Sequence, residues 1–184
     1  MPKSCLLVLL FVGLGCAVGE GEGEIDGQIA LKDCNKQGTY HLDPNFFSAE
    51  PREERLDILL QHGSDLQIRS DGMFIYIDDA SALQNDMLEQ PLTVDDGLWE
   101  AVLFLNETCP VERRKTPVSL YATSGTITFN AIYAPEEDKD AVSIDAVLDA
   151  LHFENSETPD DNYADLSGYF RFIYNRGKPA QRFP

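Results

Sequence analysis

The sequence predicts a mainly β fold: a single antiparallel β-sandwich or barrel-like domain with at most one or two short helices. Several segments alternate apolar and polar residues with a period of two, which is typical of half-buried strands. Turn signals separate these segments, and seven prolines between positions 44 and 159 recur too often for long helices. A body of about 150 residues is large enough for one core, and neither a repeat nor a change in composition divides it.

Strands are expected in the first half of the body at 56–60, 66–77 and 99–105. Within 66–77, Ser70-Asp71-Gly72 is a turn signal, so we expect a hairpin in which Gly72 supplies a positive φ. The run 99–105 is almost continuously apolar and is too short for a typical helix, which indicates a buried strand.

In the second half, 118–120 and 127–131 are expected to be strands separated by a break at Ser124-Gly125. Segment 170–174 alternates again, and Gly168 before it indicates a bulge. Segment 142–152 also alternates, and we favour a strand because neighbouring strands need a partner. Its apolar spacing fits an amphipathic helix as well. Short helices are expected, if anywhere, at 52–60 and 80–88.

Residues 1–15 are expected to form a secretory signal peptide. Lys3 is the only charged residue before Glu20, residues 6–11 are an unbroken apolar run, and small residues follow that run. The apolar stretch from 6 to 19 has 14 residues, which is shorter than the roughly 20 needed to span a membrane. The leader therefore predicts export and not a membrane-spanning anchor.

Two processing sites are compatible with this leader. A general signal peptidase is expected to cut after Gly19, where Ala17-Val18-Gly19 supplies small residues. Alternatively, Val12-Gly13-Leu14-Gly15-Cys16 resembles the lipobox of bacterial lipoproteins. That resemblance implies cleavage before Cys16, a lipid on Cys16 and attachment to a membrane of a bacterial cell envelope; the alternative is a secreted protein. The Gly-Glu repeat then makes 16–24 a flexible tether and 25–184 the folded domain.

Three segments, namely Ser70-Asp71-Gly72, 124–129 and 176–184, look similar to segments of uncharacterised bacterial surface lipoproteins of β-rich fold. This resemblance implies a compartment and a fold, and it implies no activity. The last segment follows Arg171 and contributes three of the basic residues near the C-terminus. We expect this tail to pack along a sheet edge, although a basic end could instead contact an anionic surface.

The cysteines agree with an exported protein. Cys5 and Cys16 lie in the leader, so Cys34 and Cys109 remain in the body and are expected to form a disulfide. A zinc site fits less well, because the chain has no Cys-x-x-Cys and its three histidines, including His152, are far apart in sequence. His152 falls within an apolar alternation and is expected in the core or an interface.

The charge excludes one class of function. The chain has 32 acidic and 14 basic residues, a formal net charge of −18, whereas a nucleic-acid binder needs a basic face. The best local candidate for a cation site is Asp160, Asp161, Asn162 and Asp165, which would suit calcium. This segment lacks the EF-hand order, so solvated acidic loops are the alternative interpretation.

These observations predict a non-catalytic surface protein, a binding or structural module with an unknown protein or polysaccharide partner. No catalytic residue is assigned and no cofactor is expected, since the sequence shows neither a Gly-x-Ser-x-Gly elbow nor a phosphate-binding loop. The first alternative is a carbohydrate- or calcium-dependent binding module that uses the acidic loops. The second is a small secreted hydrolase with an unrecognised carboxylate pair.

Overall fold

The mainly β prediction is confirmed. The computed structural model describes residues 21–63, 70–110, 118–132 and 142–174. These residues form one α-helix, two 3-10 turns and ten strands: β1 (Gly21–Leu31), η1 (Lys32–Cys34), β2 (Lys36–Leu42), β3 (Phe46–Arg52), β4 (Arg55–Gln61), β5 (Asp71–Ile77), α1 (Ala80–Asp86), β6 (Pro91–Thr93), η2 (Val94–Asp96), β7 (Trp99–Leu105), β8 (Ser119–Ala131), β9 (Val142–Glu154) and β10 (Asn162–Tyr174).

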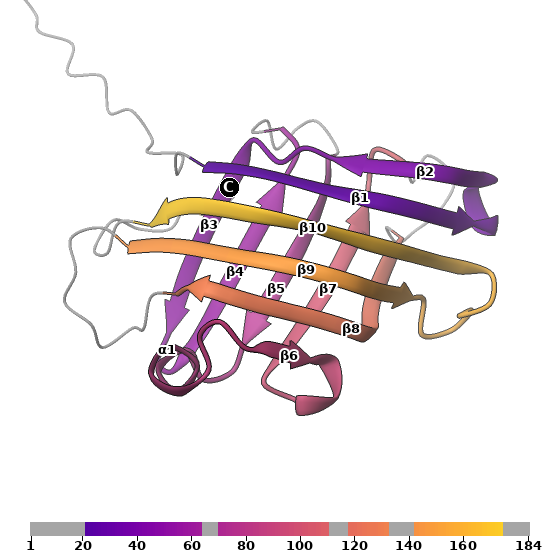
Figure 1. Cartoon of the computed structure of the whole chain (residues 1–184). Coiled ribbons are helices and arrows are strands. Elements are labelled where there is room, and N and C mark those ends of the chain that lie inside the picture. Colours follow the sequence, from indigo (N-terminus) through magenta and orange to yellow (C-terminus); the bar gives the residue numbers. More distant parts are fainter. Residues whose placement is uncertain (1–20, 64–69, 111–117, 133–141, 175–184) are drawn as a thin grey trace, which may run out of the picture.

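The strands form one curled antiparallel sheet with the order β2-β1-β10-β9-β8-β7-β5-β4-β3, and β6 pairs with β8. Nearly every strand lies beside its neighbour in the chain, and β1 pairs with β10 to join the two ends of the sequence. The curl folds the sheet over itself, so that β2, β1, β10, β9 and β8 form a front layer across a back layer of β3, β4, β5 and β7 (Figure 1). The result is a half-barrel in which both layers share one core.

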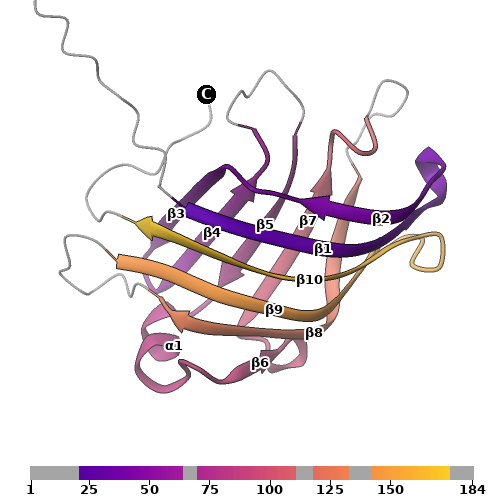
Figure 2. The same cartoon turned by 45° about the horizontal axis from the view of Figure 1, so that its top comes forward.

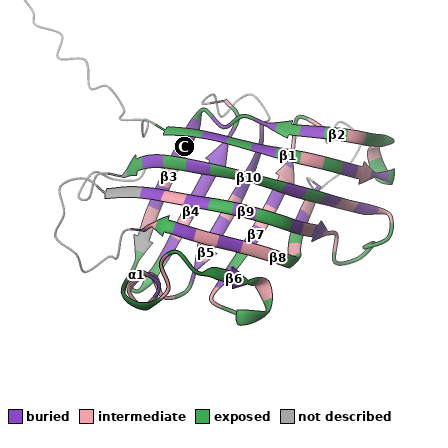
Figure 3. Cartoon of the chain, viewed as in Figure 1, coloured by how far each residue is buried: buried purple, intermediate pink, exposed green. Residues whose placement is uncertain are grey.

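The core lies between the two layers, where alternate residues of each strand point inward. Buried and exposed positions alternate along the strands, as expected for a period of two (Figure 3). Trp99 of the back layer and Phe129, Phe153 and Phe170 of the front layer are at most 1% exposed. The rings of Phe47 on β3 and Phe172 on β10 stack at 5.5 Å, which holds the edge strand β3 against the front layer.

The predicted tether is wrong for its last four residues, because β1 begins at Gly21 and pairs with β10 from its first residue. The Gly-Glu alternation is itself a period-two pattern that places small residues toward the neighbouring layer and carboxylates outward. Glu22 accepts a charge-assisted hydrogen bond from Arg171 across this pair at 2.5 Å. Any tether is therefore confined to 16–20, which lie outside the described residues.

The predicted turn at Gly72 is also wrong. Gly72 lies inside β5, opposite Gln61 of β4 and Phe104 of β7, and its φ is not positive. A Cβ at this position would collide with the Phe104 ring and with the backbone oxygen of Leu60. The glycine is thus required for close approach between strands, and β4 is the hairpin partner of β5. Segment 66–68 lies outside the described residues.

The break expected at Ser124-Gly125 is a bulge within the continuous strand β8. Gly125 has a φ of 104°, and the register of β8 with β9 shifts on both sides of it. The bulge expected at Gly168 is confirmed by a register shift between Leu166 and Gly168, where β9 contributes the extra residue at Ala150, whose φ is 49°. Bulges of this kind bend a strand and increase its local twist.

The three segments for which a helix was considered have different outcomes. Segment 142–152 is a strand, β9, which pairs with β8 on one side and β10 on the other. Segment 52–60 is not helical, because its residues form the end of β3, a turn and most of β4. The segment predicted at 80–88 contains α1, whose N-terminus is capped by Asp79, with its carboxylate accepting from the amide of Ala82 at 2.8 Å.

Candidate functional site

The outer face of the back layer carries a row of apolar side chains. Leu59, Phe74 and Val102 lie on β4, β5 and β7 of the back layer. Tyr121 lies at the start of β8, where this strand pairs with β7 before it continues in the front layer, and the register places each of the four directly beside the next. Their strand neighbours Met73 and Leu103 point to the core and are fully buried, so the row points away from it. We call this row, together with the adjacent side chains of Tyr76 and Phe104, the apolar face.

Exposure increases along the apolar face. Leu59 is 4% exposed at one end, Phe74 and Val102 are half-buried, and Tyr121 is 50% exposed at the other end. An antiparallel sheet normally presents polar residues to solvent on the face opposite its core. A contiguous apolar row on such a face is typical of a binding surface.

The aromatic rings of the apolar face contact one another. The rings of Phe74 and Tyr76 are 5.8 Å apart and lie within 8° of parallel. The Phe104 ring lies 5.6 Å from Phe74 at an interplanar angle of 45°. Phe74 is therefore central to a cluster whose geometry is held by ring contacts before any ligand binds.

A charged rim borders this face at the β3–β4 hairpin. The Arg55 guanidinium lies 4.9 Å from the centroid of the Tyr76 ring, a cation–π contact. Arg55 and Arg52 both contact the Asp57 carboxylate, at 3.1 Å and 3.2 Å, and Arg52 also contacts Glu50 at 3.1 Å. Burial, assisted by the Asp57 charge, raises the pKa of Tyr76, so its phenol stays neutral at the rim.

The sequence contained a signal for the apolar face. The run 99–105 was predicted to be a buried strand because it is almost continuously apolar, and β7 confirms a strand there. Its inward residues Trp99, Ala101, Leu103 and Leu105 are buried, but Val102 and Phe104 face outward and are only half-buried. In an antiparallel sheet, a continuous apolar run thus indicates an apolar outer face as well as a core face.

The outer face of the front layer carries two pairs of histidine and carboxylate. His41 on β2 lies opposite Asp26 on β1, with Nδ1 2.7 Å from the carboxylate. His152 on β9 lies opposite Asp165 on β10, with Nδ1 2.6 Å from Asp165 and Nε2 2.9 Å from Glu154. Of the two alternatives expected for His152, the core is wrong: the side chain is half-buried, because the bulge in β9 directs it outward. A place in an interface stays a prediction.

The pH dependence of stability is expected to depend on His152. The hydrogen bond to Asp165, followed by that to Glu154, raises the pKa of His152 above its ordinary value of 6.5. A raised folded-state pKa means that this group stabilises the fold fully below pH 6.5 and that its contribution is lost as the pH rises through the folded value. Melting temperatures measured from pH 6 to pH 9 should therefore decrease more for the wild type than for His152→Gln. Equal decreases would show that the imidazolium makes no such contribution.

The structure places the four candidate calcium ligands near the turn between β9 and β10, but it gives three of them other partners. Asp161 pairs with Lys32 at 2.9 Å, and Asp165 binds His152. Asn162 is fully buried, where it accepts from the Asp33 amide and donates to Thr158. These three side chains connect strands and turns. These contacts account for the polar side chains at the three positions without a bound cation. Asp160 is exposed.

The predicted disulfide is present. It joins Cys34 at the end of η1 to Cys109 in the turn after β7, with Cα atoms 5.6 Å apart. Beside it, the 6%-exposed Asp71 accepts hydrogen bonds from the amides of Glu107 and Thr108, at 2.8 Å and 3.1 Å, and from the Tyr40 hydroxyl at 3.3 Å. Burial raises the pKa of Tyr40, which keeps its hydroxyl a donor. Disulfide and carboxylate together connect the two layers.

The other residues singled out from the sequence lie outside the described part of the chain. These are Cys16, the candidate for lipid attachment, and the basic residues of the tail beyond residue 174. Arg171, the described basic residue nearest the C-terminus, pairs with the chain's own Glu22.

No protein-family model, no curated protein and no solved structure matches the chain. A fold alone does not identify a function, so the chemistry of the surface must carry the argument.

Proposed function

We propose that this protein is an exported, non-catalytic binding protein and that the apolar face of the back layer is its binding surface. The observation that supports this most is the continuous row from Leu59 to Tyr121, which ends in a half-exposed tyrosine on a face that would otherwise be polar.

The composition of this face favours a protein partner. Tyrosine and arginine are enriched among the residues that contribute most to binding at protein interfaces. Here Tyr76, Tyr121, Arg52 and Arg55 lie around the apolar centre of the row. The formal charge of −18 attracts a cationic partner at long range. The partner we propose is therefore a protein segment with an apolar centre and basic flanks.

A specific observation also supports a second candidate, a polysaccharide. The rings of Phe74 and Tyr76 stack with their centroids 5.8 Å apart and their planes within 8° of parallel. Such an ordered aromatic pair can pack against the apolar side of a sugar ring, while the carboxylates at the rim accept from its hydroxyls. This candidate uses the same residues as the first. It predicts that a soluble polysaccharide binds the apolar face, whereas the first candidate predicts that a basic peptide does.

Replacing Tyr121 is expected to weaken binding at this face. A lysine-rich amphipathic helical peptide serves as the probe, with fluorescence anisotropy at low salt as the measurement. We expect Tyr121→Ser to weaken its affinity roughly tenfold, since an interface tyrosine contributes on the order of 1–2 kcal/mol. Added salt should weaken binding of the wild type as well.

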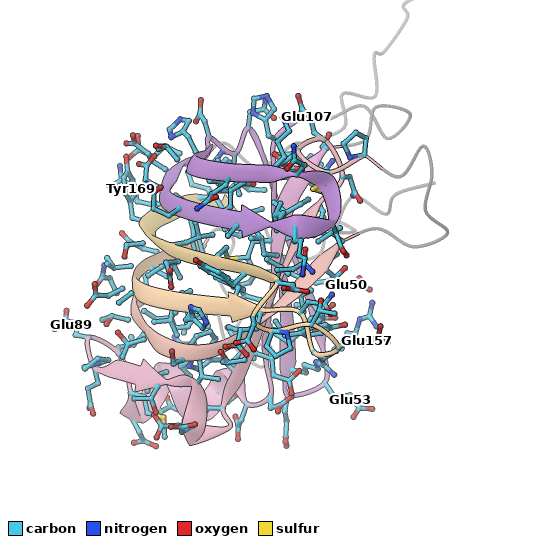
Figure 4. The ribbon with its side chains drawn as sticks, turned by 90° about the vertical axis from the view of Figure 1, so that its right-hand side faces the viewer. Glu50, Glu53, Glu89, Glu107, Glu157 and Tyr169 are labelled. Carbon is cyan, nitrogen blue, oxygen red and sulfur yellow. A yellow bond between two sulfur atoms is a disulfide. The ribbon has the colours of Figure 1, made fainter. Side chains whose placement is uncertain are left out.

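Tyr169→Ser is the matched control, because Tyr169 is 43% exposed on the outer side of the front layer, away from Glu50 at the rim (Figure 4). Equal loss of affinity in both variants would contradict the assignment of the site. Retention in gels that contain a soluble polysaccharide, abolished by Tyr121→Ser, would favour the second candidate over the protein partner.

We propose further that the protein is held at a membrane of a bacterial cell envelope by a lipid on Cys16. The support is the lipobox-like segment that ends at this residue and the apolar leader before it. Over the described residues, no helix is long and apolar enough to cross a membrane. Cys16→Ala is expected to move the protein from the membrane fraction to the soluble fraction after cell fractionation. An unchanged membrane fraction would refute the anchor.

A further inference from the structure

Strands β1 and β2 bring three potential metal ligands together on the outer face of the front layer. The period of two places Glu24 and Asp26 on the same side of β1, and the register places His41 of β2 directly opposite Asp26. One ligand atom from each side chain lies within 4.8 Å of the others. These strands lie side by side at one end of the front layer, on the opposite layer from the apolar face (Figure 2).

The geometry of these three side chains is close to that of a ligand set. Asp26 and His41 already approach to 2.7 Å, so only a small separation would admit an ion between them. Both side chains are more than half exposed, which gives an ion and its water molecules free access. Strand pairing fixes the backbone of all three residues on regular β-structure, which positions ligands better than a loop does.

We propose that Glu24, Asp26 and His41 form a binding site for a divalent transition-metal ion, of which Zn²⁺ is the representative, with water completing its coordination. One imidazole nitrogen and two carboxylate oxygens are a donor set that zinc accepts at roughly 2.0–2.2 Å. Calcium prefers six to eight oxygen ligands, so an imidazole in the set selects against it. The site is independent of the binding function proposed for the apolar face.

The second histidine cluster supplies a comparison within the same molecule. His152 also contacts two carboxylates, but Asp165 lies at Nδ1 and Glu154 at Nε2, on opposite sides of the ring. Its carboxylate oxygens therefore do not converge with one ring nitrogen on a common point. We expect the Glu24–Asp26–His41 cluster to bind Zn²⁺ and the His152 cluster not to.

Isothermal titration of the full untagged chain with Zn²⁺ tests this inference. The wild type should bind one ion, and Glu24→Gln, Asp26→Asn and His41→Ala should each weaken the affinity by at least roughly tenfold, since replacing even a hydrogen-bond partner of a metal ligand costs about 10–100-fold. His152→Ala should bind as the wild type does, and Ca²⁺ should bind far more weakly than Zn²⁺. Fluorescence of Trp99, the only tryptophan, shows that each variant is folded.

A second measurement does not depend on any variant. Substoichiometric Cu²⁺, which has a high affinity for such ligands, should broaden the amide NMR signals of β1 and β2 around Glu24, Asp26 and His41 before those of β9 around His152. Absence of Zn²⁺ binding, binding that survives all three substitutions, or broadening centred on His152 would each overturn the proposal.

Discussion

Replacing both Cys34 and Cys109 by serine is expected to lower the free energy of unfolding by about 4 kcal/mol. The disulfide joins residues 75 positions apart, so its loss releases a long loop in the unfolded chain. A typical domain is stable by only about 5–15 kcal/mol, so this loss would bring the protein close to unfolding at ordinary temperatures. Urea denaturation followed by Trp99 fluorescence measures it, since Trp99 is 1% exposed in the fold.

Cys16→Ser is the matched control for the disulfide, because Cys16 lies in the leader segment outside the described residues. It should leave the urea midpoint unchanged, and reduction of the wild type should reproduce the double variant. A loss below about 1 kcal/mol in the double variant would show that the unfolded chain gains little freedom from opening this loop.

Asp71→Ala is expected to lower the free energy of unfolding by about 3 kcal/mol. The Asp71 carboxylate accepts from two amides and from Tyr40, and its removal leaves these donors without a partner beside the core. Hydrogen bonds to a charged group contribute roughly 1.5–3 kcal/mol each, and a buried donor left unpaired adds its desolvation cost. Urea denaturation of the variant gives the value.

Two further variants interpret that value. Tyr40→Phe removes one donor and keeps the ring, so it should cost about 1 kcal/mol. Asp95→Ala changes an exposed carboxylate on η2 and should stay within about 0.5 kcal/mol of the wild type. If Asp71→Ala lowers the free energy of unfolding no more than Asp95→Ala does, the hydrogen bonds of Asp71 do not connect the two layers as described.

The parts of the fold that the sequence predicted correctly depend on local periodicity. Strands β4 and β7 follow from the alternation at 56–60 and the apolar run 99–105, because each residue's burial depends only on which side of its own strand it occupies. The errors depend on contacts distant in sequence. Gly72 was expected in a turn, but its neighbours Leu60 and Phe104 require a glycine within a strand.

The candidate sites also combine features that depend on local periodicity with features that depend on contacts distant in sequence. The apolar run 99–105 predicted only a buried strand. The outer apolar row was missed, because it depends on the register that aligns Phe74, Val102 and Tyr121 across three strands. Glu24 and Asp26 are spaced by two residues, which indicates a shared side of a strand. No sequence pattern placed His41 beside them, since that contact depends on the pairing of β1 with β2.

The most direct test of the binding surface is photocrosslinking in cells that express the protein. A benzophenone amino acid replaces Tyr121 on the apolar face or, as the control, Tyr169 on the front layer, which have similar exposure at 50% and 43%. The proposal predicts a discrete crosslinked partner from position 121, with basic residues in the crosslinked segment, and none from position 169. Crosslinks from position 169 alone, or from neither position, would contradict the claim that the apolar face is the binding surface.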